Sequence, residues 1–277
     1  MSIDVIIPTS KNIVDSNYSL LYTIKSLLSQ TLIPNNIIIS ENLDGINTEN
    51  FIKKEFGNQI KIISSTRKSN NISFARNNGA KIGNSNIILF IDDDVIIGKK
   101  TFLKDIVDNL NYVDFYCGAK RYWAYTSWRN NLKLNYDMQH IRNILKERSY
   151  LPNAIYRTTA DFSFHNYTYI GNFGAIKRSV FEEINGFDEA YEGWSYQDTD
   201  LMMRLVSGGY NYDLMSNDEI FVYHLTHEID KHMSSDVNRK LFLEKQKEMN
   251  IKFNLNFFFG IFAYEDELSI VSKNIFP

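Results

Sequence analysis

Three consecutive aspartates, Asp92, Asp93 and Asp94, directly follow the apolar run Ile87–Ile91. Carboxylates crowded at the end of a buried strand repel one another unless a cation or hydrogen-bond donors compensate them. Hard divalent cations prefer oxygen ligands, commonly one or two carboxylates together with substrate phosphates. In an extended segment Asp92 and Asp94 would point the same way, because side chains alternate along a strand. A polar turn that caps the next helix is the alternative, and we favour a metal or nucleotide site.

A second acidic group lies at the predicted start of a helix, in the segment Gly193–Leu201. An acidic side chain in the first turn of a helix is stabilised by the helix dipole. The residues alone leave two interpretations of Asp198 open. Its carboxylate either caps the helix or acts as a general base beside the aromatic wall of Trp194.

Strand and helix patterns alternate through the first half of the chain. Short apolar runs predict strands at 5–7, 37–39, 60–63 and 87–91, and the first of them is expected to stop at Pro8. Apolar residues at helical spacing predict helices over 20–28, from 73 and over 101–110. This alternation indicates a parallel sheet, in which ligands bind beyond the carboxyl ends of the strands. Pro8–Thr9, Glu41–Asn42 and the three aspartates are therefore expected at one edge of the sheet.

The composition is that of an ordinary globular protein, with 44% hydrophobic and 23% charged residues in a chain of 277. The net charge of −3 gives no indication of a nucleic-acid partner. The single cysteine, Cys117, excludes an internal disulfide and fits a reducing compartment. No signal peptide or membrane-spanning run is apparent, so a cytoplasmic location is expected. The apolar stretch Phe257–Tyr264 leaves open a peripheral contact with the inner face of the membrane.

Taken in order, several short motifs resemble the inverting glycosyltransferases of family 2, which have the GT-A fold. They are Val5–Thr9, Ser73–Ala80, the three aspartates, Gly171–Asn172 with Ala175–Arg178, and the segments beginning at Gly186 and Gly193. Each motif is weak alone, but the ordered set is specific and covers about residues 3 to 227. The segment Gly193–Leu201 also resembles the C-terminal motif of the β-1,4-galactosyltransferases.

This resemblance implies an α/β protein with a Rossmann-like, mixed and mainly parallel sheet flanked by helices. A single large GT-A domain is expected, with a nucleotide-sugar-binding half at 1–118 and an acceptor-binding and catalytic half at 119–230. Residues 231–277 would form a C-terminal helical extension.

The family resemblance also implies roles for individual residues on the donor side. The residues expected to bind the nucleotide sugar are Pro8, Thr9, Glu41, Arg76, Asp92 and Asp93. Pro8 and Thr9 would line the uridine pocket, and Glu41 stands where the family usually has an aspartate that contacts the base. Arg76 would reach the nucleotide. Asp92 would contact the ribose, or the metal through water.

The implied cofactor is Mn²⁺ or Mg²⁺, held by Asp94 and His224. A lone histidine after an apolar strand is usually structural, so only its place in the series of motifs supports His224, and His227 competes with it. Asp198 would be the catalytic base.

The implied acceptor side contains Trp194, Gln197 and Asn172. Here the chain departs from the family, which commonly has Glu-Asp where this sequence has Gln197-Asp198. Glutamine hydrogen-bonds in both directions but carries no charge. The contact usually made by the glutamate is therefore altered.

The expected function is transfer of a hexose from a UDP-sugar donor to a hydroxyl of a saccharide, glycolipid or glycoprotein acceptor. Galactose, glucose and an N-acetylhexosamine are the candidate sugars. The frequent Asn, Ile and Lys suggest a bacterial cell-surface polysaccharide or glycoprotein glycan as the product. One alternative is a catalytically impaired protein of the same fold that binds sugars or acts as a scaffold. Another is a nucleotidyltransferase, although Pro8–Lys11 lacks the glycine- and basic-rich phosphate loop typical of that class.

Overall fold

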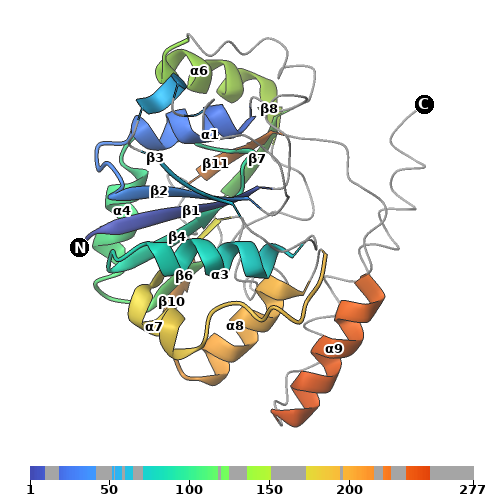
Figure 1. Ribbon diagram of the computed structural model, residues 1–277. Coiled ribbons are helices and arrows are strands. Elements are labelled where there is room, and N and C mark those ends of the chain that lie inside the picture. Colours follow the sequence, from blue (N-terminus) through green and yellow to red (C-terminus); the bar gives the residue numbers. More distant parts are fainter. Residues whose placement is uncertain are drawn as a thin grey trace, which may run out of the picture.

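The computed structural model describes residues 1–9, 19–41, 52, 54–57, 60–64, 71–117, 120–124, 136–150, 173–193, 196–214, 221–225 and 235–249. Within these residues the large sheet contains β1 (Ile3–Thr9), β2 (Asn36–Glu41), β3 (Ile60–Ser64), β4 (Ile87–Ile91), β6 (Phe115–Cys117), β9 (Phe173–Lys177) and β10 (Tyr212–Leu214). Their order across the sheet is β10-β6-β9-β4-β1-β2-β3 (Figure 1). Strands from both sides of residue 118 therefore share one sheet.

A smaller sheet packs beside the large one and has the order β5-β11-β7-β8. Its strands are β5 (Val95–Ile97), β7 (Lys120–Ala124), β8 (Ser149–Tyr150) and β11 (Phe221–Leu225). The helices used in the description below are α1 (Ser19–Leu28), α3 (Ile72–Ile82), α4 (Phe102–Asn109), α6 (Met138–Arg148), α7 (Arg178–Glu183), α8 (Gln197–Ser207) and α9 (Ser235–Glu248).

The predicted mixed, mainly parallel sheet is confirmed. β1 pairs in parallel with β2 and β4, and β2 with β3, whereas β9 is antiparallel to β4 and β6. The prediction that the first strand stops at Pro8 is wrong, because β1 continues to Thr9 beside β2. Its pairing with β4 covers Ile3 to Ile6, so Pro8 lies where β1 is paired on the β2 side. A proline without an N–H is tolerated at such a position.

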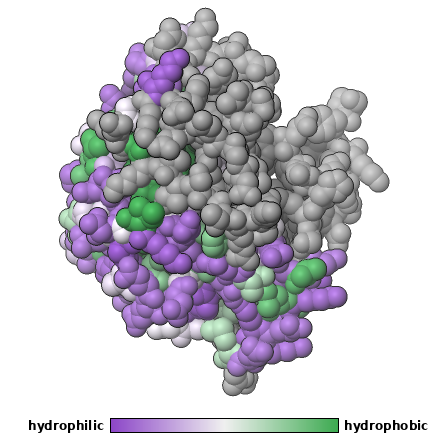
Figure 2. Space-filling model, in the orientation of Figure 1, coloured by the Kyte–Doolittle hydropathy of each residue, from purple (hydrophilic) through white to green (hydrophobic). Residues whose placement is uncertain are grey.

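The large sheet is buried on both faces, and the side chains of β1 show how. Ile3, Val5 and Ile7 pack in a cluster with α1 and α4, while Ile6 packs in a second cluster with α3, α7 and α8. This division follows from the alternation of side chains along a strand. Burial on both faces explains why the strands read as continuous apolar runs. The described surface over α3 and α8 is mostly hydrophilic, as expected where helices face water (Figure 2).

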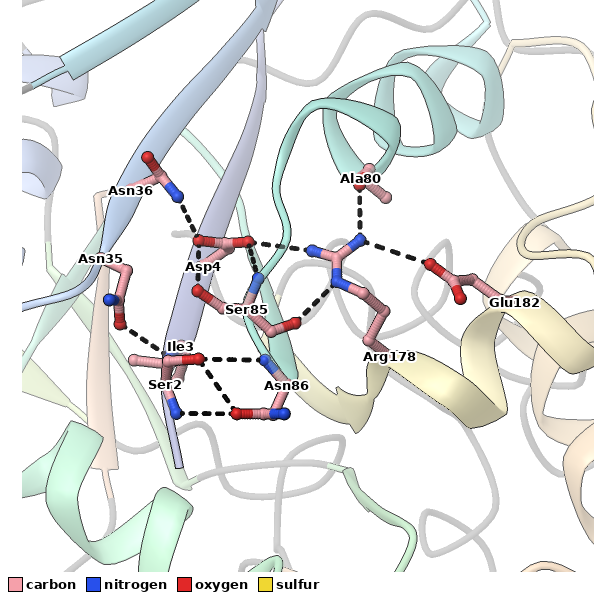
Figure 3. Close-up of polar contacts among 10 residues, drawn as sticks. All are labelled: Ser2, Ile3, Asp4, Asn35, Asn36, Ala80, Ser85, Asn86, Arg178 and Glu182. Atoms are coloured by element: carbon pink, nitrogen blue, oxygen red, sulfur yellow. Dashed lines mark hydrogen bonds and ion pairs between the residues drawn. The ribbon is translucent and has the colours of Figure 1, made fainter.

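One charged side chain, Asp4, lies within this apolar sheet and is fully buried (Figure 3). Its carboxylate accepts hydrogen bonds from the Asn36 amide at 2.6 Å, from the backbone N–H and hydroxyl of Ser85 at 2.8 and 2.7 Å, and from Arg178 at 2.9 Å. Burial raises the pKa of Asp4, but the hydrogen bonds and the Arg178 charge outweigh it and hold that pKa below its usual value. A Cβ at Gly83 would lie 2.1 Å from a carboxylate oxygen of Asp4, so the site requires glycine there.

None of the helices in the described ranges combines the length and apolar character needed to cross a bilayer. The apolar stretch Phe257–Tyr264 lies outside the described residues. Of the predicted C-terminal helical extension, α9 is described. It lies beside α8 at the lower right of Figure 1.

Candidate active site

The three aspartates form a tight turn rather than an extended segment. The backbone N–H of Val95 donates to the carbonyl of Asp92 at 3.3 Å, which closes a four-residue turn. The expectation that Asp92 and Asp94 alternate along an extended strand is therefore wrong, because β4 ends at Ile91. The turn instead gives each carboxylate a partner from a different part of the chain.

Asp93 connects this turn to the end of β1. The hydroxyl of Thr9 donates to its carboxylate at 2.6 Å. In the sheet register Thr9 pairs with Glu41, and Pro8 with Ser40, so the ends of β1 and β2 lie side by side. Pro8, Thr9 and Glu41, all predicted to bind the nucleotide, thus meet at the carboxyl edge of the sheet. The Glu41 side chain lies outside the described part of the structure.

Asp94 lies next to His224 because strand pairing in the small sheet brings the two residues together. β11 runs antiparallel to β5 with His224 opposite Val95, and the N–H of Leu225 donates to the Asp94 carbonyl at 2.9 Å. The Nε2 atom of His224 is 3.5 Å from a carboxylate oxygen of Asp94. The two predicted metal ligands, 130 positions apart in sequence, are therefore neighbours.

Arg76 joins the aspartate turn to the predicted base. It lies on α3, which begins after Asn71, whose side chain accepts the N–H of Phe74 at 2.8 Å. The Arg76 guanidinium donates to Asp198 at 3.0 Å and to Asp92 at 3.4 Å. Its side chain is only 3% exposed. A buried guanidinium thus lies between Asp92, which is predicted to bind the donor, and Asp198, which is the predicted base.

The position of Asp198 excludes the helix-cap interpretation. Helix α8 begins at Gln197, and the N-cap position belongs to Tyr196. Asp198 is the second residue of the helix, where the positive end of the helix dipole stabilises its negative charge. Its side chain is 28% exposed and is therefore partly open to solvent.

Gln197 is buried and donates from its side-chain amide to the carbonyl of Gly193 at 2.8 Å. This contact closes the loop that leads into α8, and a glutamate at position 197 would have no proton for it at neutral pH. The other two predicted acceptor residues, Trp194 and Asn172, lie outside the described residues, as does His227.

Sequence reasoning missed the residue that fastens the loop before α8 to α3. The side-chain oxygen of Asn77 accepts the N–H of Phe187 at 2.9 Å, and its NH₂ group donates to the Phe187 carbonyl at 2.8 Å and to Glu189 at 2.9 Å. Asn77 follows Arg76 directly in the motif, which is the only signal that the sequence offers. Its partners are 110 and more positions away and have no local signature.

Asp92 is under electrostatic strain in this site. Burial is the largest cause that raises the pKa of Asp92, Arg76 opposes the rise and the charges of Asp94, Asp93 and Asp198 add to it, so that the pKa is about 7. A carboxyl whose pKa is higher in the folded state stabilises the fold most below the unfolded pKa of about 4. That contribution is lost as the pH rises toward 7, because ionised Asp92 is disfavoured in the folded protein.

We therefore expect Asp92→Asn to stabilise the metal-free protein at pH 8 by about 1–2 kcal/mol and to have less effect at pH 5. Urea unfolding in EDTA at the two pH values measures the difference. Asp108→Asn is the control, because Asp108 is an exposed carboxylate on α4. An Asp92→Asn variant that is less stable than the original protein at pH 8 would contradict this electrostatic picture.

The residues present fit part of a divalent cation site. Within the described residues, no three His, Cys, Asp or Glu side chains gather closely enough to hold a metal ion by themselves. Asp94 and His224, the predicted ligands, would supply one oxygen and one nitrogen. Mn²⁺ and Mg²⁺ sites in phosphate-binding proteins commonly complete their coordination with substrate oxygens and water.

Comparisons with known proteins identify the family of the chain. The model of glycosyl transferase family 2 matches residues 4–184, and the chain therefore belongs to that family. A second model, described as the N-terminal domain of galactosyltransferase, matches residues 154–228, which include the segment Gly193–Leu201. No match was found among curated protein sequences.

The fold resembles that of the S. aureus protein TarS. A structure of TarS residues 1–349 has a TM-score of 0.62 and 16% identity, covering 92% of this chain and 66% of that one. The same part of TarS in complex with UDP-GlcNAc gives a TM-score of 0.62 and 18% identity, covering 92% and 68%. The longer TarS structure is covered over only 37% of its length, with a TM-score of 0.57, 16% identity and 82% coverage of this chain. The predicted GT-A fold is thereby confirmed.

Proposed function

We propose that the protein is an inverting glycosyltransferase that moves a hexose from a UDP-sugar to a hydroxyl of a saccharide acceptor. The observation that carries the proposal is the pairing of Arg76 with both Asp92 and Asp198, at the carboxyl edge of a family 2 sheet. The binding of UDP-GlcNAc and of UDP by TarS, which has the same fold, supports a uridine nucleotide donor.

Asp198 is proposed to act as the general base. In a single in-line displacement, the acceptor oxygen forms a bond to the anomeric carbon while the bond from that carbon to the diphosphate oxygen breaks. The hydroxyl proton passes to the Asp198 carboxylate, and UDP leaves with the bonding electrons. The configuration at the anomeric carbon inverts, because attack and departure occur on opposite faces.

The donor is proposed to bind along the ends of β1, β2 and β4. Pro8, Thr9 and Glu41 would surround the uracil and ribose, and Asp92 and Asp93 would face the sugar nucleotide. Arg76 would reach the nucleotide from α3, where its guanidinium pairs with Asp92 and Asp198. Trp194, Gln197 and Asn172 stay proposals for the acceptor side.

Asp94 and His224 would hold a divalent cation such as Mn²⁺ or Mg²⁺, which when bound stabilises negative charge on a diphosphate. The acceptor is proposed to be a saccharide of a cell-surface polysaccharide, glycolipid or glycoprotein. Its modification would take place on the cytoplasmic side, in peripheral contact with the membrane.

We expect the affinity for Mn²⁺ to fall most in Asp94→Ala, less in His224→Ala and least in His227→Ala. Asp94 supplies the charged oxygen, and His224 is the histidine that the small sheet places beside it. Calorimetric titration of Mn²⁺ in the presence of UDP, with melting curves to confirm folding, measures the order. A larger loss in His227→Ala than in His224→Ala would transfer the ligand to His227.

A donor screen tests the proposed function. UDP release from UDP-galactose, UDP-glucose, UDP-GlcNAc and UDP-GalNAc is measured with Mn²⁺, with Mg²⁺ and with EDTA, with and without saccharide acceptors. One donor should give UDP slowly alone and faster with the right acceptor. Binding without UDP release from any donor would indicate the impaired sugar-binding protein, and pyrophosphate release from UTP would indicate a nucleotidyltransferase.

A further inference from the structure

The backbone just before the proposed base is strained. Tyr196 has φ 69° and ψ −14°, a left-handed backbone conformation that residues other than glycine rarely adopt. Its carbonyl accepts the N–H of Asp200 at 2.8 Å and so begins the first turn of α8. The backbone conformation of Tyr196 therefore sets the direction in which α8 starts, and with it the position of Asp198. Such a conformation persists only where the surrounding structure imposes it.

Helix α9 supplies that surrounding structure. Phe242 is 2% exposed, and its ring centroid lies 5.4 Å from that of Tyr196, in a cluster completed by Tyr191 and Met203. The helix is seen next to α8 in Figure 1. A bulky ring packed against Tyr196 opposes any rotation of the backbone that would swing the tyrosine ring away.

The same face of α9 holds the rest of the loop. Asn238 is buried and donates to the carbonyl of Glu192 at 2.8 Å, directly before Gly193. Lys245 forms an ion pair with Asp188 and lies 4.9 Å from the ring centre of Tyr191. Residues 238, 242 and 245 follow the i, i+4, i+7 spacing that places them on one stripe of the helix.

We propose that α9 is a clamp that holds Asp198 in its catalytic position, with Phe242 and Asn238 as positioning residues. The clamp acts through the residues that α9 contacts before Asp198, namely Asp188, Glu192 and Tyr196. This inference rests on the proposed function, in which Asp198 is the base. It also goes beyond the family signature, because the two family models end at residues 184 and 228, before α9 begins.

Steady-state kinetics with the best donor and acceptor tests the clamp. We expect Phe242→Ala to lower kcat by about 10- to 100-fold, the scale of a small misplacement of a reacting group. Donor affinity, measured by calorimetry, should be unchanged, and Phe242→Leu should restore most of the rate. Val237→Ala on the same helix is the control, because Val237 is 67% exposed. A folded Phe242→Ala enzyme with the original kcat would overturn the proposal.

A double variant isolates the strained residue. Glycine adopts a positive φ without the penalty that a side chain carries. We therefore expect Tyr196→Gly, introduced into the Phe242→Ala variant, to raise kcat by at least about tenfold. Two changes that act on one shared element are not additive. Additive losses in the double variant would show that Phe242 does not act through Tyr196.

Amide hydrogen exchange tests, without any substrate, whether Phe242 holds the backbone at Tyr196. The Asp200 N–H, which bonds to the Tyr196 carbonyl, should exchange at least about tenfold faster in Phe242→Ala than in the original protein. Its exchange rate should be unchanged in Val237→Ala. Unchanged exchange in Phe242→Ala would overturn the clamp even if no sugar transfer were found with any donor. Absence of transfer by the original protein would contradict the proposed function alone.

Discussion

Asp198→Asn is expected to lower kcat for sugar transfer by about 10²–10⁴-fold, the usual effect of losing a positioned general base. Asparagine is nearly isosteric, and its side-chain oxygen still accepts the hydrogen bond that Arg76 donates at 3.0 Å. It cannot take a proton at neutral pH, however. The change therefore removes the proton acceptor and leaves the surroundings nearly intact.

Donor binding separates the two sides of the site. UDP affinity of Asp198→Asn, measured by calorimetry, should stay within a few-fold of the original value, because Asp198 is assigned to the acceptor. Single-turnover rates with excess enzyme would show whether the loss lies in the chemical step. Undiminished turnover in a folded Asp198→Asn enzyme would remove Asp198 from the mechanism and leave it as the ion-pair partner of Arg76.

Asp4→Ala is expected to lower the free energy of unfolding by about 3–5 kcal/mol, a large part of the total for a domain. The substitution leaves the Arg178 guanidinium without its buried carboxylate and leaves the Ser85 N–H without its acceptor (Figure 3). Removing one partner of a buried ion pair is far more harmful than removing an exposed pair. Asp4 also ties β1 to the Asn36 end of β2, so the loss affects the centre of the sheet.

Glu182→Ala provides the matched control, since Glu182 is the other carboxylate near Arg178. It lies 3.8 Å away and its side chain is 65% exposed, so its loss should change stability by less than about 1 kcal/mol. Urea unfolding measures both variants. The low pKa of Asp4 means that its contribution is present above the unfolded pKa of about 4 and is lost as the pH falls through the folded value. Equal stabilities of Asp4→Ala and Glu182→Ala at pH 7 would refute the structural role of Asp4.

The local elements were predictable because strands that are buried in a sheet appear in the sequence as short apolar runs. The run Ile87–Ile91 was predicted as a strand and is β4 with the same bounds. The aspartates after it were expected at the carboxyl edge, and the contact between Thr9 and Asp93 places them there. Parallel strands separated by helices leave their carboxyl ends on one side, so this much follows from the order of elements alone.

The backbone conformations at particular junctions were harder to predict from the sequence. Pro8 was expected to end β1, but strand pairing on the β2 side carries the strand one residue further. The aspartates were treated as extended, and the bond from Val95 to Asp92 bends them into a turn. Asp198 was weighed as a helix cap, yet Tyr196 holds that position with a positive φ that a tyrosine does not suggest. The pairing of Pro8 with Ser40 of β2 is remote in the sequence, and the turn at the aspartates has no apolar periodicity that would announce it.

The sequence by itself determined the class of fold, the family and the residue types available for chemistry, because periodicity and ordered motifs are local properties of the chain. Only the tertiary structure decided which of these residues meet. Arg76 and Asp198 are 122 positions apart, and their ion pair depends on how α3 and α8 pack on the same face of the sheet. The contact of α9 with the loop before Asp198 likewise depends on tertiary packing, because Asn238, Phe242 and Lys245 meet partners that no local pattern identifies.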